Sequence, residues 1–172
     1  MYIRIIFNLL LIFLMVIIQQ AFIHALPLGF NYLNLVLITL VFILILFNLN
    51  LSLMWWLASA WLLDLFSFYP FGSHLLVFGI ILLIIYWLLI NFFTNRSLYS
   101  FLILIIIATI MYDFGMYFAN YLFSSEIGIE MKAGWWIIEL KHLIFNSGLT
   151  IVFFYALNFI SHQFKPVFLS KK

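Results

Sequence analysis

Charged residues are scarce in this chain. Asp, Glu, Lys and Arg make up 7% of its 172 residues, against about 25% in soluble globular domains, whereas hydrophobic residues make up 69% against about 45–50%. A chain of this length has too little interior to hide so much apolar surface from water. The composition therefore excludes soluble enzymes and disordered regulators, and a net charge of only +2 excludes a nucleic-acid-binding protein. We conclude that the chain is an integral membrane protein.

Two further absences narrow the class of membrane protein. The chain has no cysteine, which excludes disulfides, thiolate metal sites and cysteine nucleophiles. Membrane-spanning strands alternate apolar and polar residues, and runs such as Ile80-Ile81-Leu82-Leu83-Ile84-Ile85 do not. Helices satisfy their backbone hydrogen bonds internally in lipid, so the sequence predicts an all-α polytopic membrane protein.

The apolar sequence divides into six predicted transmembrane helices that form a single domain, 1–172. A bilayer core of about 30 Å needs roughly 20 apolar residues per helix. The cluster Asn48–Ser52 is the only polar break within the apolar stretch 33–68, so we expect two short helices there. Pro70 and Gly72 are expected to separate the third helix from the fourth. The predicted spans are 5–22, 33–47, 51–66, 73–93, 98–121 and 137–160.

The distribution of basic residues predicts the orientation. An even number of spans places both termini on one side of the membrane. With the termini in the cytoplasm, the outer segments hold only Lys132 and Lys141 as basic residues, beside three glutamates. Basic residues concentrate in cytoplasmic segments of membrane proteins, which favours this orientation. The cytoplasmic basic residues are then Arg4, Arg96, Lys165, Lys171 and Lys172.

Two acidic residues lie well inside the predicted spans, Asp64 and Asp113. An ionisable side chain at the bilayer centre costs about 2.5 to 3.5 kcal/mol, so each needs local compensation, and no Lys or Arg is within reach. Asp64 precedes a turn and the helix that opens at Ser73. We expect its carboxylate to meet the free N–H groups of that opening, which favours a structural role over a binding or catalytic one.

Asp113 and the histidines leave more alternatives open. Asp113 either faces Asp64 and shares a proton with it, or bonds a Ser, Tyr or Asn of a neighbouring helix, which is the more frequent arrangement. Glu139 and His142 have the spacing of a helical metal pair, but with only two ligands a solvated turn is favoured and no metal is predicted. His74 is expected at a helix boundary. No phosphate-binding loop, zinc motif or serine nucleophile elbow is present.

Several short motifs follow one another in a particular order along residues 26–93. They are Leu26-Pro27, Asn34-Leu35-Val36-Leu37, Leu62-Leu63-Asp64-Leu65-Phe66-Ser67 and Pro70-Phe71-Gly72. This order resembles the family of the bacterial rod shape-determining protein MreD. The chain departs from the family at Ser59-Ala60-Trp61, where a glycine is usual, and at its weakly basic loop 94–97. The resemblance implies about six transmembrane helices, in a fold similar to the substrate-binding subunits of energy-coupling factor transporters.

The resemblance also implies a function. It implies a non-catalytic subunit of the cell-wall elongation machinery, without cofactor, in the bacterial inner membrane with both termini cytoplasmic. The expected partner is an MreC-like bitopic protein and, through it, a class B penicillin-binding protein, a RodA-like glycosyltransferase and the MreB filament. Asp64, Ser67, Pro70 and Gly72 carry over from the family. With Asn34 and Asp113 they are the predicted structural or partner-binding residues.

Two other functions stay open. A substrate-binding subunit of an energy-coupling factor vitamin transporter would need a pocket at the outer helix ends, where Asp64, Trp135, Trp136 and Glu126 are expected to hold a small amphipathic ligand. An intramembrane protease similar to lipoprotein signal peptidase would use Asp64 and Asp113, although the chain lacks the Asn-containing motifs of that family.

Overall fold

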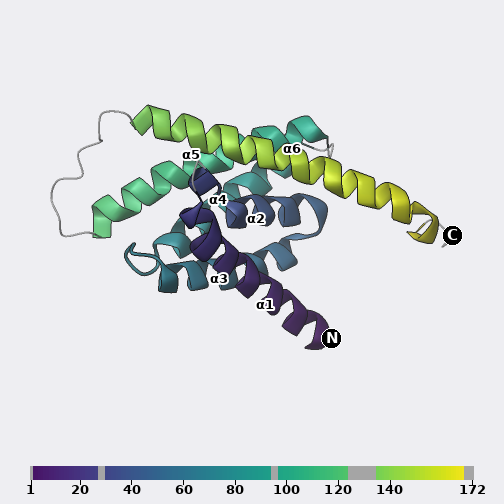
Figure 1. Ribbon diagram of the computed structural model, residues 1–172, viewed down its shortest axis with the longest axis horizontal. Coiled ribbons are helices and arrows are strands. Elements are labelled where there is room, and N and C mark those ends of the chain that lie inside the picture. The colour runs from purple at the N-terminus through teal and green to yellow at the C-terminus, as the bar shows by residue number, and fades with distance from the viewer. Residues whose placement is uncertain (1, 27–29, 94–96, 124–134, 169–172) are drawn as a thin grey trace.

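The protein is all-α throughout residues 2–26, 30–93, 97–123 and 135–168, which the computed structural model describes. Consecutive helices run in opposite directions, so α1 begins and α6 ends at the same end of the bundle (Figure 1). This agrees with the multi-pass class predicted from hydropathy. The helices are α1 (Tyr2–Ile17), α2 (Leu35–Leu46), α3 (Leu49–Phe66), α4 (Ser73–Asn91), α5 (Leu98–Phe123) and α6 (Trp135–Phe168).

Five helical segments are long and apolar enough to cross a membrane, and α2 is not one of them. Its 12 residues span about 18 Å at 1.5 Å per residue, short of a hydrocarbon core of about 30 Å. Of the six helices that the sequence predicted as membrane spans, five reach the length of a span in the described residues, and the second does not. Nine of the twelve side chains of α2 are buried. A helix that is apolar on every side and enclosed by others is a core helix, and hydropathy alone does not distinguish it from a span.

The N-terminus of α2 lies inside the bundle because amide side chains bind its free backbone N–H groups. The Gln19 Oε1 atom accepts from the Leu35 N–H at 2.7 Å, and the Asn34 Oδ1 atom accepts from the Leu37 N–H at 3.0 Å. The Asn146 Oδ1 atom on α6 accepts from the Asn34 N–H at 2.9 Å. Unpaired backbone groups are costly where water is absent, so these amides satisfy the start of the helix without water.

Gln19 reaches this position from a distorted end of α1. The helix continues as a π-helical segment, Ile18–Phe22, and then as a 3₁₀ turn, Ile23–Ala25. Another 3₁₀ turn, Phe30–Tyr32, leads into α2. The Gln19 side chain, only 4% exposed, also donates from Nε2 to the Leu33 carbonyl at 2.8 Å. The end of α1 is thereby joined to the beginning of α2.

The turns between α2, α3 and α4 form where the sequence predicts them. Asn48 ends the apolar stretch and caps α3, its Oδ1 atom accepting from the Leu51 N–H at 2.9 Å. At the next turn, Gly72 has a φ of 94°, a left-handed conformation that side chains disfavour. The Pro70 carbonyl accepts from Ser73 Oγ at 2.6 Å and from Ser73 N–H at 3.1 Å. The helix α4 therefore begins at Ser73.

The first and last helices cover the outside of the bundle. Only 17% of the apolar windows Ile5–Phe22 and Trp135–Phe159 is buried, against 33–39% for α3, α4 and α5. Most of their exposed side chains are apolar, as lipid contact requires, and Lys141 and Asn158 are exceptions on α6. Arg96, Lys132, Lys171 and Lys172, which contributed to the predicted orientation, lie outside the described residues.

Candidate functional site

A buried acid closes the turn between α3 and α4. The Asp64 Oδ1 atom accepts from the His74 N–H at 2.8 Å, and Oδ2 accepts from the Leu75 N–H at 3.2 Å. These are the contacts with the opening of the next helix that the sequence predicted. The Asp64 side chain is 0% exposed, so the carboxylate has exchanged water for the free N–H groups at the α4 N-terminus.

His74 is a second partner of Asp64 that the sequence analysis missed. Its Nδ1 atom lies 2.9 Å from Asp64 Oδ1, and the residue is 3% exposed. A half-solvated ring at a helix boundary was expected; His74 does stand in the first turn of α4, but its ring is buried. The residue is close to Asp64 because the turn at Pro70 and Gly72 folds α4 back along α3.

A cavity of about 850 Å³ adjoins this turn. It lies between the chain leading into α2, the α3–α4 turn, α5 and the first half of α6, at the end of the bundle opposite the start of α1 (Figure 1). The cavity is within the range of about 300–1,000 Å³ typical of small-molecule sites. The sequence analysis expected a pocket only for the vitamin-transporter alternative.

One face of α5 and one face of α6 supply about half of the polar side chains that line the cavity. Residues three and four apart lie on the same face of a helix. On α5 this face carries Thr109, Tyr112, Asp113, Tyr117 and Asn120, and on α6 it carries Glu139, His142 and Asn146.

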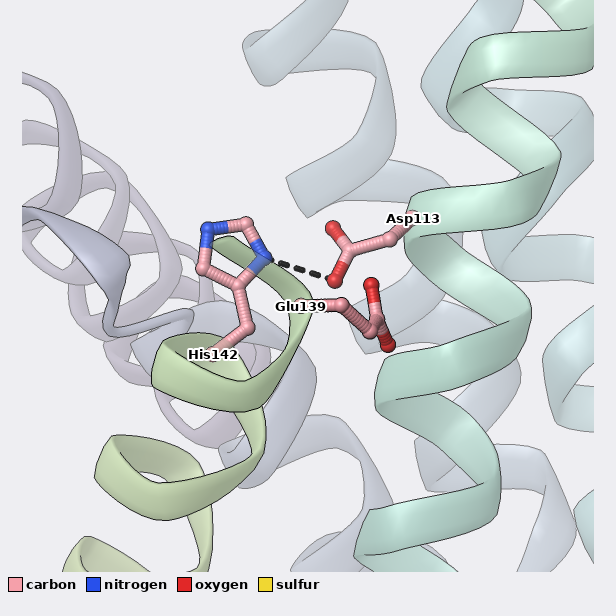
Figure 2. Close-up of side chains that lie close together, drawn as sticks. All are labelled: Asp113, Glu139 and His142. Carbon is pink, nitrogen blue, oxygen red and sulfur yellow. Dashed lines mark hydrogen bonds and ion pairs between the residues drawn. The ribbon is translucent and has the colours of Figure 1, made fainter. Parts of the chain in front are cut away.

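Three of these side chains form a cluster between α5 and α6 (Figure 2). The His142 Nδ1 atom lies 2.6 Å from Asp113 Oδ2. One ligand atom from each of Asp113, Glu139 and His142 lies within 4.8 Å of the other two. Glu139 is 6% exposed, and its Oε1 atom has no hydrogen-bond partner among the described residues.

The cluster corrects the interpretation of Glu139 and His142 as a solvated turn. Glu139 is buried, and the third group that the pair lacked in the sequence is Asp113 of α5. Lys141 points elsewhere: its Nζ atom lies 5.1 Å from the centre of the Tyr32 ring, which in turn lies 5.2 Å from the His142 ring. The Lys141 ammonium group therefore contacts the Tyr32 ring, which in turn contacts His142 of the cluster.

Asp64 and Asp113 do not form a dyad in the described structure. Each carboxylate has its own histidine, His74 for Asp64 and His142 for Asp113, and no hydrogen bond joins the two acids. Asp113 lines the cavity, whereas Asp64 does not. Asp113 does bond a side chain of a neighbouring helix, but the partner is His142 instead of the expected Ser, Tyr or Asn.

The other predicted site residues divide between the turn and the cavity. Asn34 and Ser67 line the cavity, as does Trp135. The Ser67 Oγ atom is buried and has no partner among the described residues, and its N–H ends α3 by donating to the Leu63 carbonyl at 2.8 Å. Trp136 is 74% exposed and does not line the cavity, and Glu126 lies outside the described residues.

The fold and the cavity define a class: a polytopic α-helical membrane protein whose polar side chains converge at one end of the bundle. No protein-family model, curated protein or solved structure matches the chain. Function is therefore argued from the residues themselves.

Proposed function

We propose that the protein is a non-catalytic membrane subunit of the cell-wall elongation machinery that holds an MreC-like bitopic partner against its bundle. The observation that carries the proposal is the local structure of the motif that resembles MreD. Asp64 accepts hydrogen bonds from the N–H groups of His74 and Leu75 and thereby fixes the α3–α4 turn. Residues that act together in one turn support the resemblance more strongly than a match of residue identities alone.

The remaining residues of the motif act in the same turn. Ser67 ends α3 through its N–H, the Pro70 carbonyl binds Ser73, and Gly72 adopts the positive φ of the turn. Together these contacts hold α3 and α4 as a rigid antiparallel pair. A rigid pair in the bundle suits a subunit that presents a fixed surface to another membrane protein.

The outer helices offer the surface for such a partner. The windows Ile5–Phe22 and Trp135–Phe159 are the least buried of the five spans. Association of helices in lipid depends on close side-chain contact between apolar faces. A single-span partner is proposed to pack on these helices, and both termini are proposed to lie in the cytoplasm, which places the cavity at the outer side of the membrane.

Purification from the native membrane tests this function. The full chain, extracted in mild detergent after crosslinking, is expected to copurify with a single-span protein that has an extracytoplasmic domain. Conditional depletion is expected to turn rod-shaped cells round. A partnerless monomer after crosslinking, together with unchanged cell shape on depletion, would refute the proposal.

The cavity favours a second candidate, a solute-binding subunit similar to those of energy-coupling factor vitamin transporters. Its volume of about 850 Å³ and its polar lining suit a small amphipathic molecule. Trp135, which lines the cavity, is proposed to contact such a ligand. Thermal stabilisation of the purified protein by a vitamin, abolished by Trp135→Ala, would support this candidate. No shift across a vitamin panel would exclude it.

A further inference from the structure

We propose that Asp113, Glu139 and His142 bind a divalent transition-metal ion of the Zn²⁺ class at the wall of the cavity. The proposal is independent of the function proposed above. Two helices bring the three groups together, Asp113 from α5 and the i, i+3 pair from α6. Figure 2 shows both carboxylates and the imidazole ring gathered in the space between these helices.

A buried carboxylate oxygen without a hydrogen-bond partner is a second, independent indication that the cluster binds a ligand. Glu139 is 6% exposed and its Oε1 atom has no hydrogen-bond partner among the described residues. A buried carboxylate oxygen without a partner is costly, and the Asp113 carboxylate, which bonds His142, lies within 4.8 Å of Glu139. A bound cation would satisfy the free oxygen and neutralise the repulsion between the two acids.

The types of ligand atom select the class of ion. Imidazole nitrogen favours Zn²⁺ and its first-row neighbours, whereas Mg²⁺ and Ca²⁺ prefer ligand sets made of oxygen alone. Bond lengths of about 2.1 Å in a tetrahedron place ligand atoms about 3.4 Å apart. To reach this spacing, distances of up to 4.8 Å would shorten and the 2.6 Å contact between His142 Nδ1 and Asp113 Oδ2 would lengthen, through small rotations of the side chains. The fourth position would face the cavity, open to water or to a ligand donor.

A shared proton is the alternative occupant of the cluster. His142 Nδ1 and Asp113 Oδ2 already share one hydrogen at 2.6 Å, and Lys141 lies beyond the Tyr32 ring. If the cluster held only a shared proton, it would not bind metal ions. Metal titration therefore distinguishes the two occupants.

The experiment titrates the full chain in nanodiscs, purified with a tag that has no histidine. Zn²⁺ and Mn²⁺ are compared with Mg²⁺ and Ca²⁺ by equilibrium dialysis, and Co²⁺ supplies an absorption spectrum. We expect one Zn²⁺ per chain that excess Mg²⁺ or Ca²⁺ does not displace. Glu139→Gln and His142→Gln are each expected to weaken Zn²⁺ binding at least about 10-fold, because ligand loss costs no less than loss of an outer-shell partner.

A histidine elsewhere on the same helix provides the matched control. His162 lies 20 residues beyond His142 on α6, about 30 Å along the helix, so His162→Asn should leave Zn²⁺ affinity unchanged. Glu139→Asp, which keeps the charge, serves as a second variant if Glu139→Gln does not fold, and it should bind Zn²⁺ with intermediate affinity. Failure of the native protein to bind Zn²⁺, Mn²⁺ or Co²⁺ would overturn the proposal. Unchanged Zn²⁺ affinity in any folded variant of Glu139 or in His142→Gln would also overturn it.

Discussion

Replacing Asp64 by alanine tests the brace between α3 and α4. The substitution removes the acceptor of two backbone N–H groups, those of His74 and Leu75, and of the His74 ring. The site is fully buried, so the donors gain no water in exchange. At about 1 to 2 kcal/mol for each orphaned backbone donor, the expected loss in the free energy of unfolding is about 3 kcal/mol. Asp64→Asn keeps one acceptor oxygen and should lose about half as much.

Reversible unfolding in mixed detergent micelles, titrated with SDS and followed by tryptophan fluorescence, measures this loss. Leu65→Ala is the matched control, because Leu65 is the next residue of α3 and is 51% exposed on the outer surface. Its substitution should change the free energy of unfolding by less than about 0.5 kcal/mol. If Asp64→Ala were no more destabilising than Leu65→Ala, Asp64 would not brace the hairpin and our main structural argument would be wrong.

Two further substitutions test the turn and the buried helix in the same titration. Gly72→Ala should destabilise the protein by about 1–2 kcal/mol, because Gly72 has a φ of 94°, whereas Gly148→Ala, where an added Cβ meets no atom within 4 Å, should be neutral or slightly stabilising. Equal effects of the two would contradict the assigned turn. Gln19→Leu should cost about 2–3 kcal/mol, since it leaves the Leu35 N–H and the Leu33 carbonyl unpaired. A change below about 0.5 kcal/mol would show that α2 does not depend on this amide.

Contacts between residues close in sequence could be predicted. Asn48 divides two apolar helices because its side chain caps the helix that follows it. Asp64 meets the N–H of His74 only ten residues away, across a turn that Pro70 and Gly72 already indicate. Such contacts depend on local backbone geometry, which residue types and spacing specify.

The side chains that bind the start of α2 could not be predicted, because they come from distant parts of the chain. Gln19 is 16 residues before the N–H group that it binds, and Asn146 is 112 residues from its partner. Hydropathy counts apolar residues and gives no information on which amide reaches which backbone group. Hydropathy also does not give the orientation of the helices in the membrane, so the orientation was predicted from Arg96 and the C-terminal lysines.

The sequence contains a pattern of polar residues that indicates two walls of the cavity. Polar residues recur at helical spacing along 109–120 and again along 139–146, which marks one polar face on each of two apolar helices. The sequence does not show that these faces meet. Only the antiparallel pairing of α5 with α6 brings Asp113 to Glu139 and His142.

A pair of single-cysteine variants tests the central claim, that polar faces of a lipid-embedded bundle enclose a cavity that water enters. Tyr117 lines the cavity, whereas Phe118, one residue further along α5, is 51% exposed on the outer surface at nearly the same depth. The chain has no cysteine of its own, so each variant carries one thiol. In nanodiscs, Tyr117→Cys should react with a water-soluble maleimide and Phe118→Cys should not, because thiolate forms only in contact with water. Protection of both thiols, or faster reaction of Phe118→Cys, would contradict the cavity and the site built on it.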